Sequence, residues 1–346
     1  MSKTVYLGMS GGVDSSVSAL LLKEQGYHVV GVYMKNWSKS LPGAKCPWAE
    51  DLADSKRVAT HLGLDFHVFD FEKPYFDRVV TYMIDEYQKG HTPNPDIWCN
   101  QEIKFNLFLD TCLAHGADLI ATGHYAKTED GRLYRAKDDK KDQTYFLSRV
   151  TAGALQKTLF PLGDLTKSEV KALAKKHGLH VAQKPESMGI CFIGEVGIRE
   201  FLSQYITAEP GDVIDQETNV KIGTHDGAVF YTIGQRHGFH ASSNLPYYVV
   251  KKDIKNNRIV VSQNLASPTL WYKSIELRDL HWIDDTTDQT GQPTELQARI
   301  RHQAPLIPAT LTDTTLTFTT EQRGLAQGQT IAFYNDGQCL GSGIIS

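Results

Sequence analysis

The sequence is poor in cysteine, with five among 346 residues. They are odd in number, scattered, and include no C-x-x-C pair. This pattern indicates neither a disulfide framework nor a zinc site, and the clustered cysteines of an iron–sulfur protein are missing. In a reducing compartment, cysteines with this spacing take part in a reaction or are simply buried. The five cysteines are Cys46, Cys99, Cys112, Cys191 and Cys339.

Long apolar runs and an excess of basic charge are also missing. No run approaches the roughly 20 apolar residues that span a bilayer, and the start of the chain has no leader character, so we expect a cytosolic protein. The net charge of −4 argues against a uniformly basic nucleic-acid binder. However, residues 127–184 carry +6 between two acidic parts. This block is either a solvated charged helix or a footprint for a phosphate backbone.

The first half of the chain alternates short β-branched runs with helical periods. Strand-like "TVYLGM", "HVVGVYM" and "DFHVFDF" are separated by helices expected at residues 13–25 and 49–62, with others at 74–88 and 103–115. This predicts an α/β fold with a Rossmann-like parallel sheet covered on both faces. Because ligands bind outside the carboxyl ends of such strands, we expect the loops 10–16, 34–37 and 123–125 to share one crevice.

The second part of the chain has no helical periodicity and instead shows short strand-like runs separated by frequent turn residues. Thr-rich alternation with Gly and Pro punctuation in residues 296–345 is typical of a small β-barrel or sandwich. We therefore predict a catalytic domain at residues 1–203, a central β-rich domain at 204–268 and a C-terminal β-barrel at 269–346.

The stretch "LGMSGGVDSS" ends the first strand and begins the first helix. It has neither the lysine of a G-x-x-x-x-G-K-[ST] loop nor the G-x-G-x-x-G pattern. Two glycines, three hydroxyls and Asp14 at a helix N-terminus can still hold a pyrophosphate, and the Asp14 carboxylate can hold Mg²⁺. The stretch resembles the PP-loop of ATP pyrophosphatases, which transfer AMP to a substrate oxygen. The alternative is a βα turn that binds nothing.

Two cysteines are candidates for the chemistry that follows. Cys99 lies in "GHTPNPDIWCN", where Pro93 and Pro95 predict an extended loop and Asp96 stands three residues before the thiol. Cys191 lies in the apolar run "SMGICFIGE". Sequence alone does not place the two together, and Cys191 is also a plausible small core residue.

Several longer sequence motifs indicate which family of ATP pyrophosphatases the sequence resembles. "MSGGVDSSVSALLLKEQGY", "MKNW", "HTPNPDIWCNQEIKF", "ATGHYA", "KDQTYFL", "FPLG", "GICFIGE", "YTIGQR" and "CLGSGII" follow in this order over the whole chain. Together they resemble the tRNA-specific 2-thiouridylases. The resemblance implies ATP-dependent 2-thiolation of the wobble uridine in the tRNAs for lysine, glutamate and glutamine. It implies adenylation of the C2 oxygen, and then sulfur transfer from a cysteine persulfide.

The resemblance also implies residue roles. Cys191 carries sulfur as a persulfide, Cys99 attacks it and leaves a Cys99–Cys191 disulfide, and Asp96 is an acid or base. ATP is bound by Gly8, Met9, Ser10, Gly11, Gly12, Val13, Asp14, Ser15, Met34 and Gly123. The target base meets Asn94, Pro95 and Asp96. Other tRNA contacts are His124, Lys141, Asp142, Gln143, Arg301, His302 and Gln329.

The implied partners are tRNA and a persulfide-donating sulfur carrier or cysteine desulfurase, with ATP and Mg²⁺ and a monomeric protein. The sequence departs from the family at Glu186, where Asp is common, and at His237 and His302. Two other functions stay open. An amidating or ligating enzyme would share the Gly-rich loop without needing the cysteines or the β-rich tail. An RNA-binding module that uses ATP only as a conformational ligand would tolerate loss of either cysteine.

Overall fold

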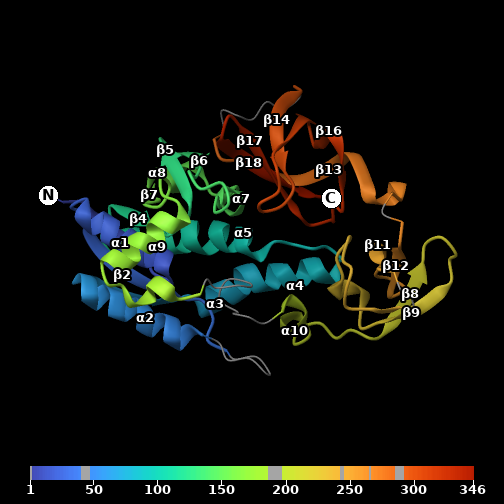
Figure 1. The fold of residues 1–346 in the computed structure, drawn as a ribbon, viewed down its shortest axis with the longest axis horizontal. Coiled ribbons are helices and arrows are strands. Elements are labelled where there is room, and N and C mark those ends of the chain that lie inside the picture. Colours follow the sequence, from blue (N-terminus) through green and yellow to red (C-terminus); the bar gives the residue numbers. More distant parts are fainter. Residues whose placement is uncertain (1, 40–46, 186–196, 242–244, 265, 285–291) are drawn as a thin grey trace.

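The computed structural model describes residues 2–39, 47–185, 197–241, 245–264, 266–284 and 292–346. In Figure 1 the chain forms an α/β part at the N-terminal end, a barrel above its centre and a smaller β-rich part at the far end. Among the described helices, none combines the length and apolar character that a membrane span requires.

The first sheet is parallel, with strand order β3-β2-β1-β4-β7. The alternate residues of the central strand enter different cores: Val5 and Leu7 pack on one face of the sheet and Tyr6 on the other. Both faces are therefore covered, as the near-continuous apolar runs predict. The strands are β1 (Thr4–Gly8), β2 (His28–Lys35), β3 (Asp65–Asp70), β4 (Leu119–Ala121) and β7 (Thr158–Leu159).

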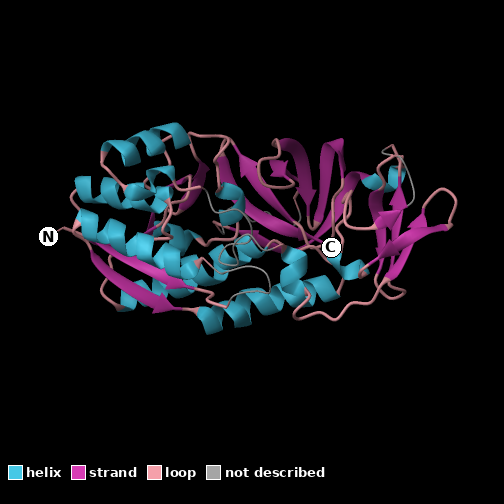
Figure 2. Ribbon diagram, turned by 60° about the horizontal axis from the view of Figure 1, so that its bottom comes forward, coloured by secondary structure: helices cyan, strands magenta, loops and turns pink. Residues whose placement is uncertain are grey.

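Helices cover the two faces of this sheet, which Figure 2 shows as cyan ribbons around the strands. On the face of Val5 lie α1 (Val13–Glu24), α2 (Trp48–Leu62) and α9 (Lys167–Lys176). The opposite face is covered by α4 (Thr81–Gln88), α5 (Pro95–Cys99) and α6 (Phe108–Ala114). The predicted doubly covered α/β fold is confirmed.

The remaining helical segments are short. A π-helical turn, η1 (Phe76–Val80), joins α3 (Glu72–Tyr75) to α4, and a longer one, η2 (Asn100–Leu107), joins α5 to α6. The others are α7 (Thr144–Leu147), α8 (Ala152–Gln156), α10 (Ile198–Leu202), and the 3₁₀ turns η3 (His180–Gln183), η4 (Ala228–Phe230) and η5 (Pro268–Leu270).

The central β-rich part is a sheet of order β10-β9-β8-β12-β11. Its small core gathers Val213, Val249, Ile259 and Val261 around the ring of Tyr231. Its strands are β8 (Gly211–Asp215), β9 (Lys221–His225), β10 (His240–Ala241), β11 (Tyr248–Asp253) and β12 (Arg258–Ser262).

The C-terminal part is a closed antiparallel barrel, since β13 pairs with both β16 and β18. This confirms the predicted barrel. Its strands are β13 (Trp271–Trp282), β14 (Thr294–Arg299), β15 (Ile307–Thr312), β16 (Thr315–Arg323), β17 (Thr330–Asn335) and β18 (Gln338–Ile345).

A hairpin from the first domain extends the barrel sheet. Strand β5 (Ala126–Glu129) pairs with β6 (Arg132–Arg135), and β6 pairs in turn with β18, with Leu133 opposite Cys339. The Cys339 thiol also contacts the backbone oxygen of Thr144. The barrel is therefore fastened directly to the catalytic domain, although the chain between them passes through the central β-rich part.

Candidate functional site

The loop between β1 and α1 leaves a helix start open to a ligand. Gly12 stands at the N-cap position, where no side chain of the described residues caps the first turn. The Ser15 hydroxyl accepts a hydrogen bond from the Ser10 amide at 3.2 Å, and the Ser16 hydroxyl donates back to the Gly12 carbonyl at 2.8 Å. The free N–H groups and the positive dipole end favour an anion here.

Close packing of backbone explains the glycines at this loop. Gly11 has a φ of 75°, and a Cβ built there would lie 2.4 Å from the Asp51 carbonyl oxygen. A Cβ on Gly123 would lie 2.8 Å from the Ser15 nitrogen, and one on Gly8 would lie 3.0 Å from the Met34 methyl carbon. The ends of β1, β2 and β4 therefore meet at one edge of the sheet. That the loops 10–16, 34–37 and 123–125 share one crevice there stays a prediction.

The carboxylate of Asp14 is held by two residues from distant parts of the chain. Lys167 Nζ lies 2.7 Å and 2.8 Å from its two oxygens, and the Tyr125 hydroxyl donates to one of them at 2.9 Å. Lys167 is 8% exposed and is the first residue of α9, whose start is fixed by the capping box of Thr166 and Glu169. This lysine supplies the positive charge that the loop sequence lacks.

Lys167 is not among the site residues predicted from the sequence. Its segment "KSEVKALAKKHG" is predicted as a solvated charged helix or as part of a phosphate-backbone footprint. The local signal is the T-x-x-E capping box that sets where the helix starts. Mg²⁺ binding by Asp14 stays a prediction, because the carboxylate is already hydrogen-bonded. Among the described residues, no cluster of three or more His, Cys, Asp or Glu side chains could hold a metal ion.

The predicted extended loop before Cys99 is wrong, because Pro95–Cys99 is helical. Proline is favoured at the first position of a helix, where its missing N–H would be unpaired anyway. Asn94 caps this turn, its side-chain oxygen accepting from the amides of Asp96 at 3.1 Å and Ile97 at 3.3 Å. The proline pattern therefore marks a helix start.

Cys99 is buried completely within the first core. Burial raises the pKa of its thiol to about 12, and the neighbouring Asp96 charge acts in the same direction while Lys104 opposes it. The group is thus a protonated thiol at neutral pH. Cys112 and Cys339 are buried as well. Cys191 and Cys46, and also Glu186, lie outside the described residues, so the Cys99–Cys191 pairing stays a prediction.

Several residues assigned to tRNA line the junction of the catalytic domain and the barrel. The His302 ring lies 4.5 Å from the Phe146 ring, and Gln303 donates to the Lys140 carbonyl at 3.0 Å. Arg301 is exposed next to them, and Lys141 is partly exposed. The segments 140–146 and 301–303 are therefore neighbours in space, and together they present positive charge beside an aromatic ring.

Two other residues that were predicted to contact tRNA have hydrogen-bond partners within the protein. Asp142 is fully buried, with Arg299 Nη1 at 2.6 Å and the Thr144 hydroxyl at 2.9 Å. Gln143 accepts from the Tyr125 amide at 2.9 Å. The geometry gives both side chains a structural task, and their contact with tRNA stays a prediction.

His124 and Gln329 also have protein partners. The His124 ring lies against Phe105 and Phe160 and is hydrogen-bonded to Thr122 at 2.8 Å. Burial holds its pKa well below the ordinary value, so the imidazole is neutral. Gln329 accepts from the Ala326 amide at 3.2 Å. A neutral His124 offers hydrogen bonds and carries no charge toward a phosphate.

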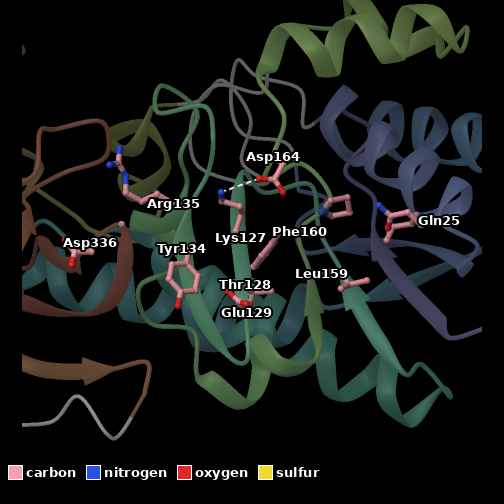
Figure 3. Close-up of a pocket in the computed structure, with 13 residues that line it drawn as sticks. Gln25, Lys127, Thr128, Glu129, Tyr134, Arg135, Leu159, Phe160, Asp164 and Asp336 are labelled. Carbon is pink, nitrogen blue, oxygen red and sulfur yellow. Dashed lines mark hydrogen bonds and ion pairs between the residues drawn. The ribbon is translucent and has the colours of Figure 1, made fainter.

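A separate surface pocket of about 690 Å³ lies beside the β5–β6 hairpin (Figure 3). Lys127 and Asp164 face each other across it at 3.3 Å, with Phe160 on its wall. None of the residues predicted from the sequence lines it. The pocket is therefore distinct from the edge where β1, β2 and β4 meet.

A helix start without a side-chain cap at the carboxyl edge of a parallel sheet is typical of nucleotide-binding α/β domains, and here two β-rich domains are attached to it. Family models match in the same order: the tRNA methyl transferase HUP domain at residues 3–195, the tRNA methyl transferase PRC-barrel domain at 199–263, and the aminomethyltransferase beta-barrel domain at 272–345.

Individual relatives agree with these models. The chain is 46% identical to the tRNA-specific 2-thiouridylase MnmA of Lactiplantibacillus plantarum, covering 99% of this chain and 94% of that one. It is also 46% identical to the MnmA of Legionella pneumophila (strain Lens), covering 100% and 99%. The chain belongs to the tRNA-specific 2-thiouridylase family. A solved 4-thiouridine synthetase is 18% identical over 58% of this chain and 50% of its own, with a TM-score of 0.38.

Proposed function

We propose that this protein is a tRNA-uridine 2-sulfurtransferase that uses ATP to replace the C2 oxygen of the wobble uridine with sulfur, forming AMP and pyrophosphate. The observation that carries the proposal is the full-length identity of 46% to curated 2-thiouridylases. The open helix start at Gly12 supports the use of ATP, and the position of Cys99 directly after an Asn94-capped turn supports sulfur transfer.

The first step is adenylation. The phosphates lie at the start of α1, where the hydroxyls of Ser10 and Ser15 and the free amides replace lost water contacts, and Met34 contacts the adenosine. The uridine C2 oxygen attacks the α-phosphorus, and pyrophosphate leaves. The Lys167 ammonium stabilises the negative charge that develops there. The Asp14 carboxylate would hold the Mg²⁺ of the nucleotide, which would stabilise the departing pyrophosphate. The full ATP set is the one the resemblance implies.

The RNA is held across the junction of the catalytic domain and the barrel. Lys141 and Arg301 contact the phosphate backbone, and Asn94, Pro95 and Asp96 meet the extruded base. Extrusion costs little, because the anticodon loop is single-stranded. The preferred substrates are the tRNAs for lysine, glutamate and glutamine.

Sulfur then replaces the adenylated oxygen. Cys191 receives sulfur as a persulfide from a carrier or desulfurase. In the direct route, the terminal persulfide sulfur attacks C2 and AMP leaves with the former C2 oxygen; the Cys99 thiolate then attacks the Cys191 sulfur, which breaks the S–S bond and frees the 2-thiouridine. In the other route, the Cys99 thiolate attacks the Cys191 sulfur first and releases hydrosulfide, which attacks C2 and displaces AMP. Both routes end with a Cys99–Cys191 disulfide that an external thiol reduces. Asp96 lies one helical turn before Cys99 and takes its proton.

The proposal also covers the setting of the enzyme. We expect it to act as a monomer in the cytosol, since each role above falls to a residue of one chain. The competing ligase function has no need of Cys99, and the binding-module function needs no thiol at all.

Mass spectrometry of digested lysine tRNA tests the function. Wild type, Cys99→Ser and Cys191→Ser are incubated with ATP, Mg²⁺ and a persulfide donor, and 2-thiouridine and AMP are quantified. The proposal predicts that only the wild type forms 2-thiouridine, although all three proteins bind tRNA. Full thiolation by a variant would remove that cysteine from the reaction. No thiolation by the wild type with any donor would favour the ligase or binding functions.

A further inference from the structure

Two consecutive residues of the barrel reach both ends of the 91–99 segment, which carries the proposed chemistry, through Glu86 at its start and Arg149 at its end. Arg278 and Asp279 lie in β13 where its pairing with β18 shifts register between Arg278 and His281. Asp279 has a φ of 52°, so the backbone turns out of regular strand geometry at this point. We call residues 278–281 the β13 bulge.

The first contact fixes the start of the 91–99 segment. Glu86, at 2% exposed, accepts a hydrogen bond from His91 Nδ1 at 2.9 Å and another from an Arg278 guanidinium nitrogen. One buried carboxylate therefore joins the end of α4, the start of the segment and the β13 bulge. The next residue is also tied to the barrel, because the Thr92 amide donates to the Gln327 carbonyl at 2.7 Å.

The second contact fixes the end of the segment. Arg149, at 5% exposed, donates to the Asp279 carbonyl at 2.8 Å and to its carboxylate at 3.1 Å. The same guanidinium lies 5.1 Å from the centre of the Trp98 ring. Trp98 in turn stacks on Tyr82 at 4.0 Å with planes 8° apart. Arg149 is thus clamped between the barrel and the residue that precedes Cys99.

These contacts meet the chain where it enters a helix. Residues 91–94 are not helical, and α5 is the first turn of a helical run that continues through η2 into α6. The cap of this first turn, Asn94, belongs to the same segment, and helix ends fray, so the placement of the turn depends on what packs against it. Asp96 and Cys99 both lie on it, and a misplacement of about 1 Å can cost about 100-fold in rate.

We propose that the β13 bulge, through Arg149 and Arg278, is the element that positions the 91–99 segment for sulfur transfer. Arg149 is a positioning residue, because it acts on Asp96 and Cys99 through Trp98. The assignment rests on the proposed function. It explains why the barrel, which contributes neither the ATP loop nor a candidate nucleophile, is fastened to this part of the catalytic domain.

The test compares a matched control with two substitutions, one on each side of the contact between Arg149 and Asp279, which we call the clamp variants. Arg149→Met removes the guanidinium, and Asp279→Gly removes the carboxylate while tolerating the left-handed backbone. Arg132→Met is the control, since Arg132 also pairs with a carboxylate at the barrel, Asp284 at 3.7 Å. No contact found among the described residues links Arg132 to α5. Thermal melting establishes that each variant is folded.

The first readout is kinetic. At saturating tRNA, we expect Arg149→Met and Asp279→Gly each to lower kcat for 2-thiouridine at least about tenfold, with the Kd for tRNA changed less than about twofold. The double variant should lose no more than the worse single variant, because both break one contact. Arg132→Met should keep the wild-type kcat. A wild-type kcat in the folded clamp variants would overturn the proposal.

The second readout does not need activity. Iodoacetamide labelling with mass spectrometry gives a rate for Cys99, and buried Cys112 and Cys339 serve as internal references. Both clamp variants should expose Cys99 to faster labelling without changing the references. Unchanged labelling of Cys99, or equal acceleration of all three thiols, would overturn the proposal. If the wild type makes no 2-thiouridine, the proposed function fails, and the labelling still decides whether the bulge positions the segment.

Discussion

Lys167 Nζ lies within 2.8 Å of both carboxylate oxygens of Asp14, although 153 residues separate the two in the chain. Tyr125 completes the arrangement by donating to the same carboxylate. The pair fixes the Lys167 ammonium beside the open start of α1, with the Asp14 carboxylate balancing its charge. In the proposed reaction, this is where negative charge moves onto pyrophosphate.

Replacing Lys167 with Met should therefore slow AMP formation about 100-fold, because the site loses a preorganised charge. Lys171→Met is the matched control, since Lys171 lies exposed on the same helix. AMP is measured under single-turnover conditions, with the enzyme in excess over tRNA and with saturating ATP. A Lys167→Met rate equal to that of the control would show that Lys167 only supports Asp14 structurally.

Gly11→Ala should destabilise the fold more than Gly26→Ala. Both glycines have positive φ, which costs a non-glycine residue about 1–2 kcal/mol. The added methyl at position 11 also meets the Asp51 carbonyl at 2.4 Å, whereas nothing lies within 4 Å at position 26. Urea denaturation measures both losses. Equal losses would mean that the loop shifts without strain.

Arg299→Met should lower the free energy of unfolding by about 3 kcal/mol, because it leaves the buried Asp142 carboxylate with weaker partners. Arg135 remains at 3.4 Å and keeps the loss at the low end. Lys127→Met, which breaks the exposed pair with Asp164, should cost less than about 1 kcal/mol. Denaturant titration compares the two, and a loss as small as that of the control would contradict a stabilising role for this link.

Lys252→Met should stabilise the protein at pH 7. The Lys252 ammonium is enclosed, without a hydrogen-bond partner among the described residues, and burial lowers its pKa from 10.5 to about 8. The unfolded chain therefore binds more protons between these values, so stability rises as pH increases from 8 to 10.5. Below pH 8 the full cost of burying the charge is present.

The expected gain for Lys252→Met at pH 7 is about 1–3 kcal/mol, and the rise in stability at alkaline pH should disappear. Lys251→Met, at the exposed neighbouring position, should do neither. Thermal or denaturant unfolding across the pH range measures both effects. Loss of stability in Lys252→Met at neutral pH would show that the ammonium has a partner when folded.

The features that depend on neighbouring residues in the sequence, such as strands and helices, could be predicted. The β-branched runs gave the strands of the parallel sheet, and the helix expected at residues 49–62 is found at Trp48–Leu62. The shared edge followed from the same sheet, because carboxyl ends of parallel strands meet. The Pro95 error was also local, since a proline that stops one helix can begin the next.

Long-range pairings could not be predicted. The Asp14 and Lys167 pair, the β6–β18 pairing and the Arg149 contact with Asp279 each join distant parts of the chain, and no periodicity encodes which surfaces meet. The residue roles came from the resemblance. The contacts add that Asp142 is buried against Arg299 and that Cys99 is a buried thiol.

The measurement that tests the central claim most directly follows the oxygen that sulfur replaces. Lysine tRNA carrying heavy oxygen at C2 of the wobble uridine is incubated with the protein, ATP, Mg²⁺ and a persulfide donor, and the AMP is analysed by mass spectrometry. The account predicts one heavy-oxygen AMP for each 2-thiouridine formed. AMP without the label, or 2-thiouridine formed without AMP, would contradict adenylation of the uridine by this protein.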